Sequence, residues 1–90
     1  MIHLIVVNES QKEGTMYITE IIGKMVIDKN ANTVGKVVDA NVNFPGWEVK
    51  HLLVKIGFIK KLNIEIDKVD KMGDKIILNV AKNELLKVML

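Results

Sequence analysis

The sequence predicts an all-β fold, a small antiparallel β-barrel of five or six short strands with a short C-terminal helix. Several segments alternate apolar and polar residues with the period of two that is typical of a half-buried strand. Turn-forming residues separate these segments at short intervals. The 90 residues are enough for one domain, and the apolar residues are mostly aliphatic, so the core must be built from Ile, Val, Leu and Met. Closing such a sheet into a barrel removes the edges that would otherwise pair with other chains.

The first fifteen residues stand apart from this pattern. Met1–Val7 is apolar enough for a short strand, whereas Asn8–Thr15 is polar without periodicity and is expected to be a loop. Two interpretations are open: residues 1–15 are an extension of a functional chain that begins near Met16, or Met1–Val7 pairs as an extra edge strand. Tyr17–Ile22 is expected to form a helical turn that the following glycine ends.

Residues 22–56 hold the clearest pattern, which predicts three consecutive strands joined by two tight turns. The strands are expected at Lys24–Asp28, Val34–Phe44 and Glu48–Ile56, and the alternation in the second is interrupted only at positions 36 and 37. The asparagines of Lys29–Thr33 favour the first turn because they tolerate left-handed backbone conformations. Pro45–Gly46 predicts a type II turn, with the proline at its second position and positive φ at the glycine.

The second half of the chain supplies the elements that would close the sheet. Phe58–Leu62 is expected to be a connector or a bend in a continuing strand, and Asn63–Asp67 alternates as a strand. Lys68–Gly73 is expected to turn the chain into a last strand at Asp74–Val80. Ala81–Leu90 has helical spacing of its apolar residues. A helix of this length is marginal by itself, so it must pack on the barrel or on another copy of the chain.

Composition excludes several classes of protein. The sequence has no cysteine, which rules out disulfides and thiolate metal sites and is consistent with a cytoplasmic location. The apolar run at the N-terminus lacks the features of a signal peptide, and no apolar run is long enough to span a bilayer, so we expect no insertion into a membrane. All thirteen basic residues are lysines and the net charge is only +2. Because lysine lacks the two-pronged geometry of arginine, sequence-specific reading of nucleic acid is disfavoured.

Two short elements and a closing segment make the chain resemble the PRC-barrel family. Ile22–Asp28 and Val34–Asp39 are similar to the glycine-lysine elements that open these domains, and Ile64–Asp67 with Met72–Leu78 is similar to their closing strands. The resemblance covers about residues 16–80, which we take as the barrel domain, and leaves out residues 1–15 and the helix at 81–90. The chain departs from the family pattern at Phe44–Trp47, where a more polar turn is common.

The resemblance implies a compact barrel without an intrinsic active site, used as an adaptor that binds other macromolecules. Members of the family include a domain of a bacterial ribosome-maturation factor, the cytoplasmic domain of a photosynthetic reaction-centre subunit and stand-alone archaeal proteins, some of them linked to cell division. The size and lysine content of this chain are similar to those of the archaeal group. The leading expectation is a non-enzymatic β-barrel adaptor that binds a macromolecular partner, in the first place a protein, with archaeal cell division as the process that the resemblance suggests. The alternative is an RNA- or ribosome-associated factor acting in rRNA processing or ribosome maturation.

No residue is predicted to act in catalysis, cofactor binding or metal binding. His3 and His51 are the only histidines and neither has a second ligand at a suitable spacing. Asp67, Asp70 and Asp74 recur at intervals of three and four, but the neighbouring glycine favours a turn with solvated acids over an ion site.

The candidate interaction surface consists of large apolar residues expected at turns and on the terminal helix: Trp47, Phe58, Leu85, Val88 and Met89. Trp47 lies just after a tight turn, and two roles are equally compatible with that position: an exposed anchor for a partner, or a cover over the barrel mouth. We expect the chain to form homo-oligomers, most simply a dimer. Lys60 and Lys61, with Lys55 nearby, are either a solvated bend or a weak patch for phosphate groups.

Overall fold

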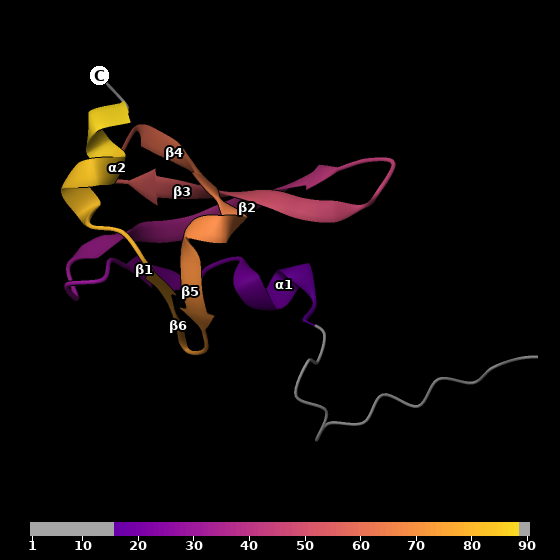
Figure 1. Cartoon of the computed structure of the whole chain (residues 1–90), viewed down its shortest axis with the longest axis horizontal. Coiled ribbons are helices and arrows are strands. Elements are labelled where there is room, and N and C mark those ends of the chain that lie inside the picture. The colour runs from indigo at the N-terminus through magenta and orange to yellow at the C-terminus, as the bar shows by residue number, and fades with distance from the viewer. Residues whose placement is uncertain (1–15, 89–90) are drawn as a thin grey trace, which may run out of the picture.

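The computed structural model describes residues 16–88, and the side chain of Val88 lies outside that description. The predicted strand at Met1–Val7 and the loop at Asn8–Thr15 also lie outside the described residues. Figure 1 shows the elements in order along the chain. They are α1 (Ile18–Ile21), β1 (Met25–Ile27), β2 (Thr33–Asn43), β3 (Glu48–Ile56), β4 (Lys60–Glu65), the 3-10 helix η1 (Ile66–Lys68), β5 (Val69–Met72), β6 (Lys75–Leu78) and α2 (Lys82–Val88).

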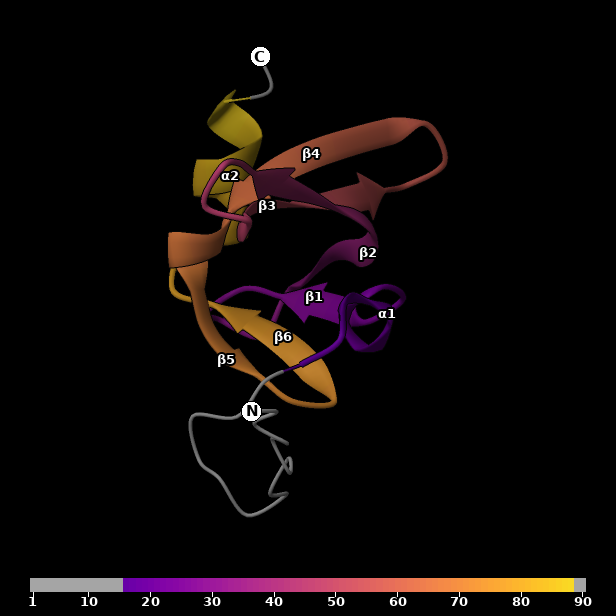
Figure 2. The ribbon, with the colours of Figure 1, turned by 90° about the vertical axis from the view of Figure 1, so that its right-hand side faces the viewer.

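The strands form one six-stranded sheet in the order β4-β3-β2-β1-β6-β5. The sheet curls into a half-barrel, with α2 at one end (Figure 2). The predicted barrel-like β fold with a short C-terminal helix is therefore confirmed. All pairs are antiparallel except β1 with β6, which run parallel. This mixed pairing arises because the chain passes through η1 from one edge of the sheet to the other, and the β5–β6 hairpin then returns to β1.

The three strands predicted between residues 22 and 56 are confirmed as β1, β2 and β3. The interruption at positions 36 and 37 has a structural cause, because the register of β2 against β3 shifts between Val37 and Asp39. This bulge lets Val37 face the core, where it is 1% exposed. Val26, Leu52 and Val54 from the neighbouring strands complete this part of the core and are each 0–1% exposed.

Three predicted boundaries in the second half were wrong. β4 begins at Lys60 and not at Asn63, because Lys60 and Lys61 already pair with the end of β3. Asp67 belongs to η1. The expected turn at Lys68–Gly73 contains β5, in which Val69 and Met72 pair with β6.

A buried carboxylate fastens the β1–β2 turn to α2. Asp28 is 1% exposed, and its Oδ1 accepts the backbone N–H groups of Asn30 (2.8 Å) and Asn32 (2.7 Å). Its Oδ2 accepts the Asn32 side-chain amide (3.3 Å) and the backbone N–H of Lys82 (2.7 Å), the first residue of α2. Burial by itself would raise the pKa of the Asp28 carboxyl, but these hydrogen bonds together lower that pKa below its ordinary value.

Candidate interaction surfaces

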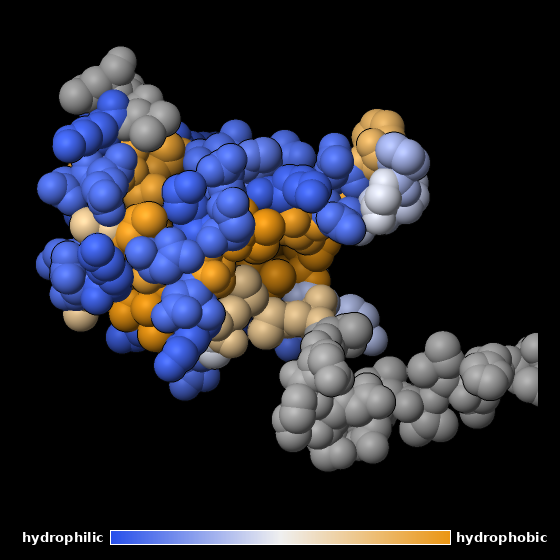
Figure 3. Space-filling view, in the orientation of Figure 1, coloured by the Kyte–Doolittle hydropathy of each residue, from blue (hydrophilic) through white to orange (hydrophobic). Residues whose placement is uncertain are grey.

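The aromatic tip, residues Phe44–Trp47, ends a long hairpin of β2 and β3 that projects from the half-barrel (Figure 1). Phe44 and Trp47 are 69% and 75% exposed, so the alternative in which Trp47 covers the barrel mouth is not the one observed. Their rings stack on each other, with centroids 5.7 Å apart and planes inclined by 29°. In Figure 3 the projecting end of this hairpin carries orange and pale surface. The two rings therefore present one apolar unit to solvent.

The backbone of the aromatic tip differs from the predicted type II turn. Gly46 does not take up positive φ, whereas Trp47 does, with φ of 58°. The Phe44–Pro45 peptide bond is cis. The prediction failed because it gave the left-handed position of the turn to the glycine, whereas Trp47 occupies it. The observed turn brings the rings at its two ends onto one another.

The basic tip, residues Lys55–Lys61, is the turn between β3 and β4 and extends away from the body (Figure 2). Phe58 and Ile59 at its apex are 94% and 88% exposed, the two highest values among the large apolar side chains of the described residues. Gly57 begins the turn with φ of 71°, a value that glycine adopts at little cost. The tip thus holds two adjacent apolar side chains almost wholly in water.

Lysines line the sides of the basic tip. In the register of the sheet, Lys55 lies opposite Lys36 on β2 and opposite Lys61 on β4. All three side chains are exposed. Residues directly opposite each other on adjacent strands share a face of the sheet, so these lysines form a row across three strands. Lys60, opposite Ile56, is also exposed.

The C-terminal part of the predicted interaction surface is corrected by the structure. Leu85 is 8% exposed and packs in the core, so it is not available to a partner. Val88 ends α2 but its side chain lies outside the described residues, as does all of Met89. The periodicity of α2 identified an apolar face correctly but could not tell whether the barrel or a partner covers it.

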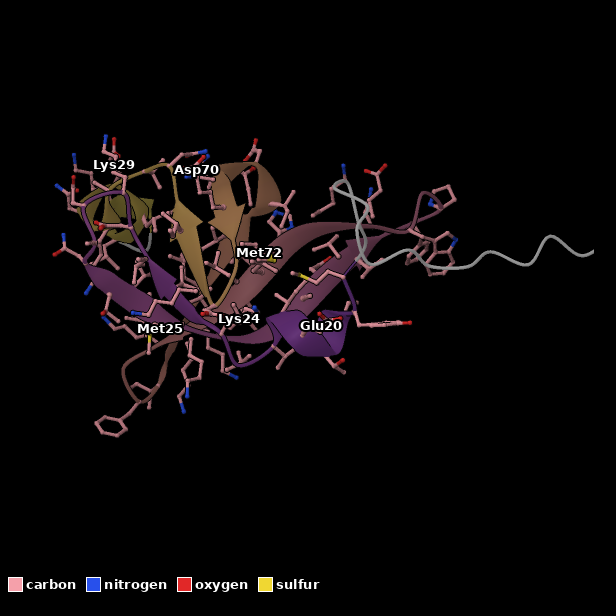
Figure 4. The ribbon with its side chains drawn as sticks, turned by 90° about the horizontal axis from the view of Figure 1, so that it is seen from below. Glu20, Lys24, Met25, Lys29, Asp70 and Met72 are labelled. Atoms are coloured by element: carbon pink, nitrogen blue, oxygen red, sulfur yellow. The ribbon has the colours of Figure 1, made fainter. Side chains whose placement is uncertain are left out.

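Sequence reasoning missed an apolar patch around α1. Tyr17 is 75% exposed, and Met16, Ile18 and Ile22 are between 36% and 41% exposed. A single short turn gives too little periodicity for its outward face to be identified. Lys24, labelled in Figure 4, follows α1 in the chain. Its Nζ donates a hydrogen bond to the carbonyl of Gly73, which connects the segment after α1 to the β5–β6 turn.

Within the part of the chain that the structure describes, the titratable side chains considered as candidate sites do not converge, and His3 lies outside that part. Asp67, Asp70 and Asp74 lie in η1, in β5 and in the β5–β6 turn, and all are exposed; Figure 4 labels Asp70 on its strand. His51 lies between Asn41 and Glu65 in a shallow hollow, and its Nδ1 is buried without a hydrogen-bond partner. Among residues 16–88 no three His, Asp or Glu side chains lie close enough together to hold a metal ion.

Two comparisons with known proteins bear on this architecture. A scan against protein-family models matches the PRC-barrel domain to residues 13–85, a range that contains the whole six-stranded sheet. A search of curated proteins finds no match. Of the helices in the described part of the chain, none has the length and hydrophobicity needed to cross a membrane.

Proposed function

The chain belongs to the PRC-barrel domain family, and we propose that it is a non-enzymatic β-barrel adaptor that binds a protein partner through the aromatic tip. The proposal is carried by one observation, the stacked and exposed pair of Phe44 and Trp47 at the end of a projecting hairpin. Aromatic side chains dominate the energetics of protein interfaces, because each buries a large area at a small cost in side-chain entropy. Exposing two of them together costs solvation free energy that a partner would recover.

The surroundings of the aromatic tip also favour a protein partner. Asn43 and Glu48 lie opposite each other in the strand register at the base of the turn. The rim next to the rings is therefore polar, and neither of these two residues is positively charged. An apolar centre within a polar rim is the usual anatomy of a protein interface. The partner we propose therefore offers a pocket for two aromatic rings.

Affinity capture from native cell extract tests the proposal when wild-type and variant baits are compared quantitatively. We expect a protein retained by the full chain to be lost at least tenfold when Phe44 and Trp47 are both changed to alanine. Lys71→Ala, at an exposed position on β5, is the matched control and should retain the same protein. Equal recovery by all three baits would remove the aromatic tip from the proposal.

Homodimer formation is a separate part of the proposal. It is supported by the exposed apolar patch at Met16, Tyr17, Ile18 and Ile22. Light scattering after size-exclusion chromatography should give the mass of a dimer for the full chain and of a monomer for the Ile18→Lys, Ile22→Lys variant. A wild-type monomer at high protein concentration would count against dimer formation.

An RNA-associated role is the second candidate, and the lysine row of Lys36, Lys55 and Lys61 is the observation that favours it. Such a row could contact a phosphate backbone, and the resulting affinity would fall steeply as salt is added because counterions are released. Filter binding to ribosomal RNA at low salt measures this directly. No affinity, or an affinity that salt does not change, would exclude the RNA role.

A further inference from the structure

The basic tip combines two properties that the aromatic tip does not share. Its apex, Phe58 and Ile59, is more exposed than any other apolar pair in the described residues and includes a purely aliphatic side chain. Its flanks are uniformly basic, since residues 49–64 contain four lysines and no acidic residue. The nearest acids along the chain, Glu48 and Glu65, lie at the far end of the β3–β4 ladder from the apex.

The register of the strands places this charge directly behind the apex. Lys60 is opposite Ile56 and Lys61 is opposite Lys55, so both pairs lie within the last two rungs before the turn. Lys36 extends the row onto β2. A flat surface touched by Phe58 and Ile59 would therefore meet several ammonium groups at the same time, each on a long and flexible side chain.

We propose that the basic tip docks the protein on the surface of an anionic lipid bilayer. Phe58 and Ile59 enter the boundary between headgroups and acyl chains, and Lys55, Lys60 and Lys61 contact the lipid phosphates, with Lys36 behind them. Apolar side chains at this depth together with lysines beside anionic headgroups are the two contributions that hold peripheral proteins on membranes. This docking is peripheral and reversible, so it revises the expectation of no membrane insertion only for this turn.

The chemistry of the apex favours a lipid surface over single-stranded RNA or a protein pocket. Single-stranded RNA gains affinity by stacking bases on aromatic rings, and Ile59 has no such face. A protein pocket would accept the apolar pair, but it would not require lysines on all three adjacent strands. A bilayer rich in anionic lipid matches both the apolar apex and the positive flanks.

Co-sedimentation of the full chain with phosphatidylcholine vesicles, with or without phosphatidylglycerol, tests the proposal. We expect binding only when phosphatidylglycerol is present, and weaker binding as salt is raised. Replacing Phe58 and Ile59 with serine should weaken binding at least tenfold, and each of Lys55→Gln and Lys61→Gln should weaken it about fivefold. Lys71→Gln, at an exposed position on β5, is the matched control and should leave vesicle binding unchanged.

A fluorescence measurement distinguishes insertion from simple charge attraction. In the double variant Trp47→Phe, Phe58→Trp, the single tryptophan should shift its emission to the blue when phosphatidylglycerol vesicles are added. Absence of vesicle binding, binding without this shift, or equal binding by the serine variant would each overturn the proposal. RNA binding by the wild-type chain that is lost in the lysine variants, with no vesicle binding, would assign the basic tip to nucleic acid and overturn the proposal as well.

Discussion

Gly35 lies where β2 passes very close to β3. A Cβ added at this position would lie 2.9 Å from Cγ1 of Val54 and 3.0 Å from the carbonyl carbon of Lys55, and it would also overlap the Lys55 carbonyl oxygen. The backbone of a paired strand cannot move aside as a flexible side chain does, so this is a case of overpacking. The glycine in the second family element is thus required by the close approach of two strands.

We therefore expect Gly35→Ala to reduce the free energy of unfolding by about 1–3 kcal/mol. Urea denaturation of the purified chain measures this change. Gly46→Ala is the control, since nothing lies within 4 Å of a Cβ added there and its φ is not positive, and its effect should stay within about 0.5 kcal/mol. Equal stability of the two variants would show that β2 and β3 are farther apart than described.

Asp28 makes the stability of the protein depend on pH in the acid range. Because the folded-state pKa of its carboxyl is lowered, the carboxylate stabilises the fold above its unfolded-state pKa of about 3.9. That contribution is lost as pH falls through the lower folded-state pKa. Asp28→Asn should lower the melting temperature near neutral pH, because an amide nitrogen cannot accept the N–H of Lys82.

Melting temperatures measured over a series of pH values test this role of Asp28. The difference in melting temperature between wild type and Asp28→Asn should be largest above about pH 5 and should shrink below about pH 3. Asp70→Asn, on the exposed face of β5, should melt close to wild type at neutral pH. A difference for Asp28→Asn that stays constant from neutral to strongly acid pH would contradict a stabilising carboxylate.

The helix α2 depends on the barrel for its stability. Seven residues are too few for a stable isolated helix, so its contacts with the barrel must hold it. Leu85 provides the apolar contact, and the Lys82 N–H bond to Asp28 fixes the first turn. The N–H of Ala81 donates to Glu84 Oε1 at 3.0 Å, which satisfies a further donor at this end.

Truncating Leu85 should therefore destabilise the whole domain. Leu85→Ala removes a side chain that is 8% exposed and should cost about 2–4 kcal/mol in urea unfolding. Lys87→Ala, on the exposed side of the same helix, should change stability by less than about 0.5 kcal/mol. If Leu85→Ala reduced the free energy of unfolding as little as Lys87→Ala, α2 would not unfold together with the barrel.

Elements that show a local sequence pattern could be predicted, whereas contacts between residues far apart in sequence could not. β2 and β3 are long and alternate over most of their length, so local pattern was sufficient to place them. β5 has only four residues with apolar side chains at its two ends, which is too short for a period to emerge. The burial of Leu85 and the bond from Lys82 to Asp28 connect residues far apart in sequence, so no local pattern announces them.

The same distinction holds for the molecule as a whole. The barrel-like fold was predictable because its strands and turns follow the pattern of the PRC-barrel family. The parallel pairing of β1 and β6 was not, because it results from a crossover between the two edges of the sheet. Trp47 and Phe58 were identified as turn aromatics, and the lysines beside Phe58 were grouped from the sequence. The stacking of Trp47 on Phe44 and the position of Lys36 opposite Lys55 emerged only from the three-dimensional structure.

In the whole molecule, two tips of different chemistry project from one half-barrel, and the central claim is that the aromatic tip engages a protein. Photo-crosslinking in living cells tests that claim most directly, with a photoreactive phenylalanine analogue placed at position 47 or, as a control, at position 71 on β5. We expect one discrete protein adduct from position 47 that is absent from position 71. No adduct at position 47, or the same adducts from both positions, would contradict it.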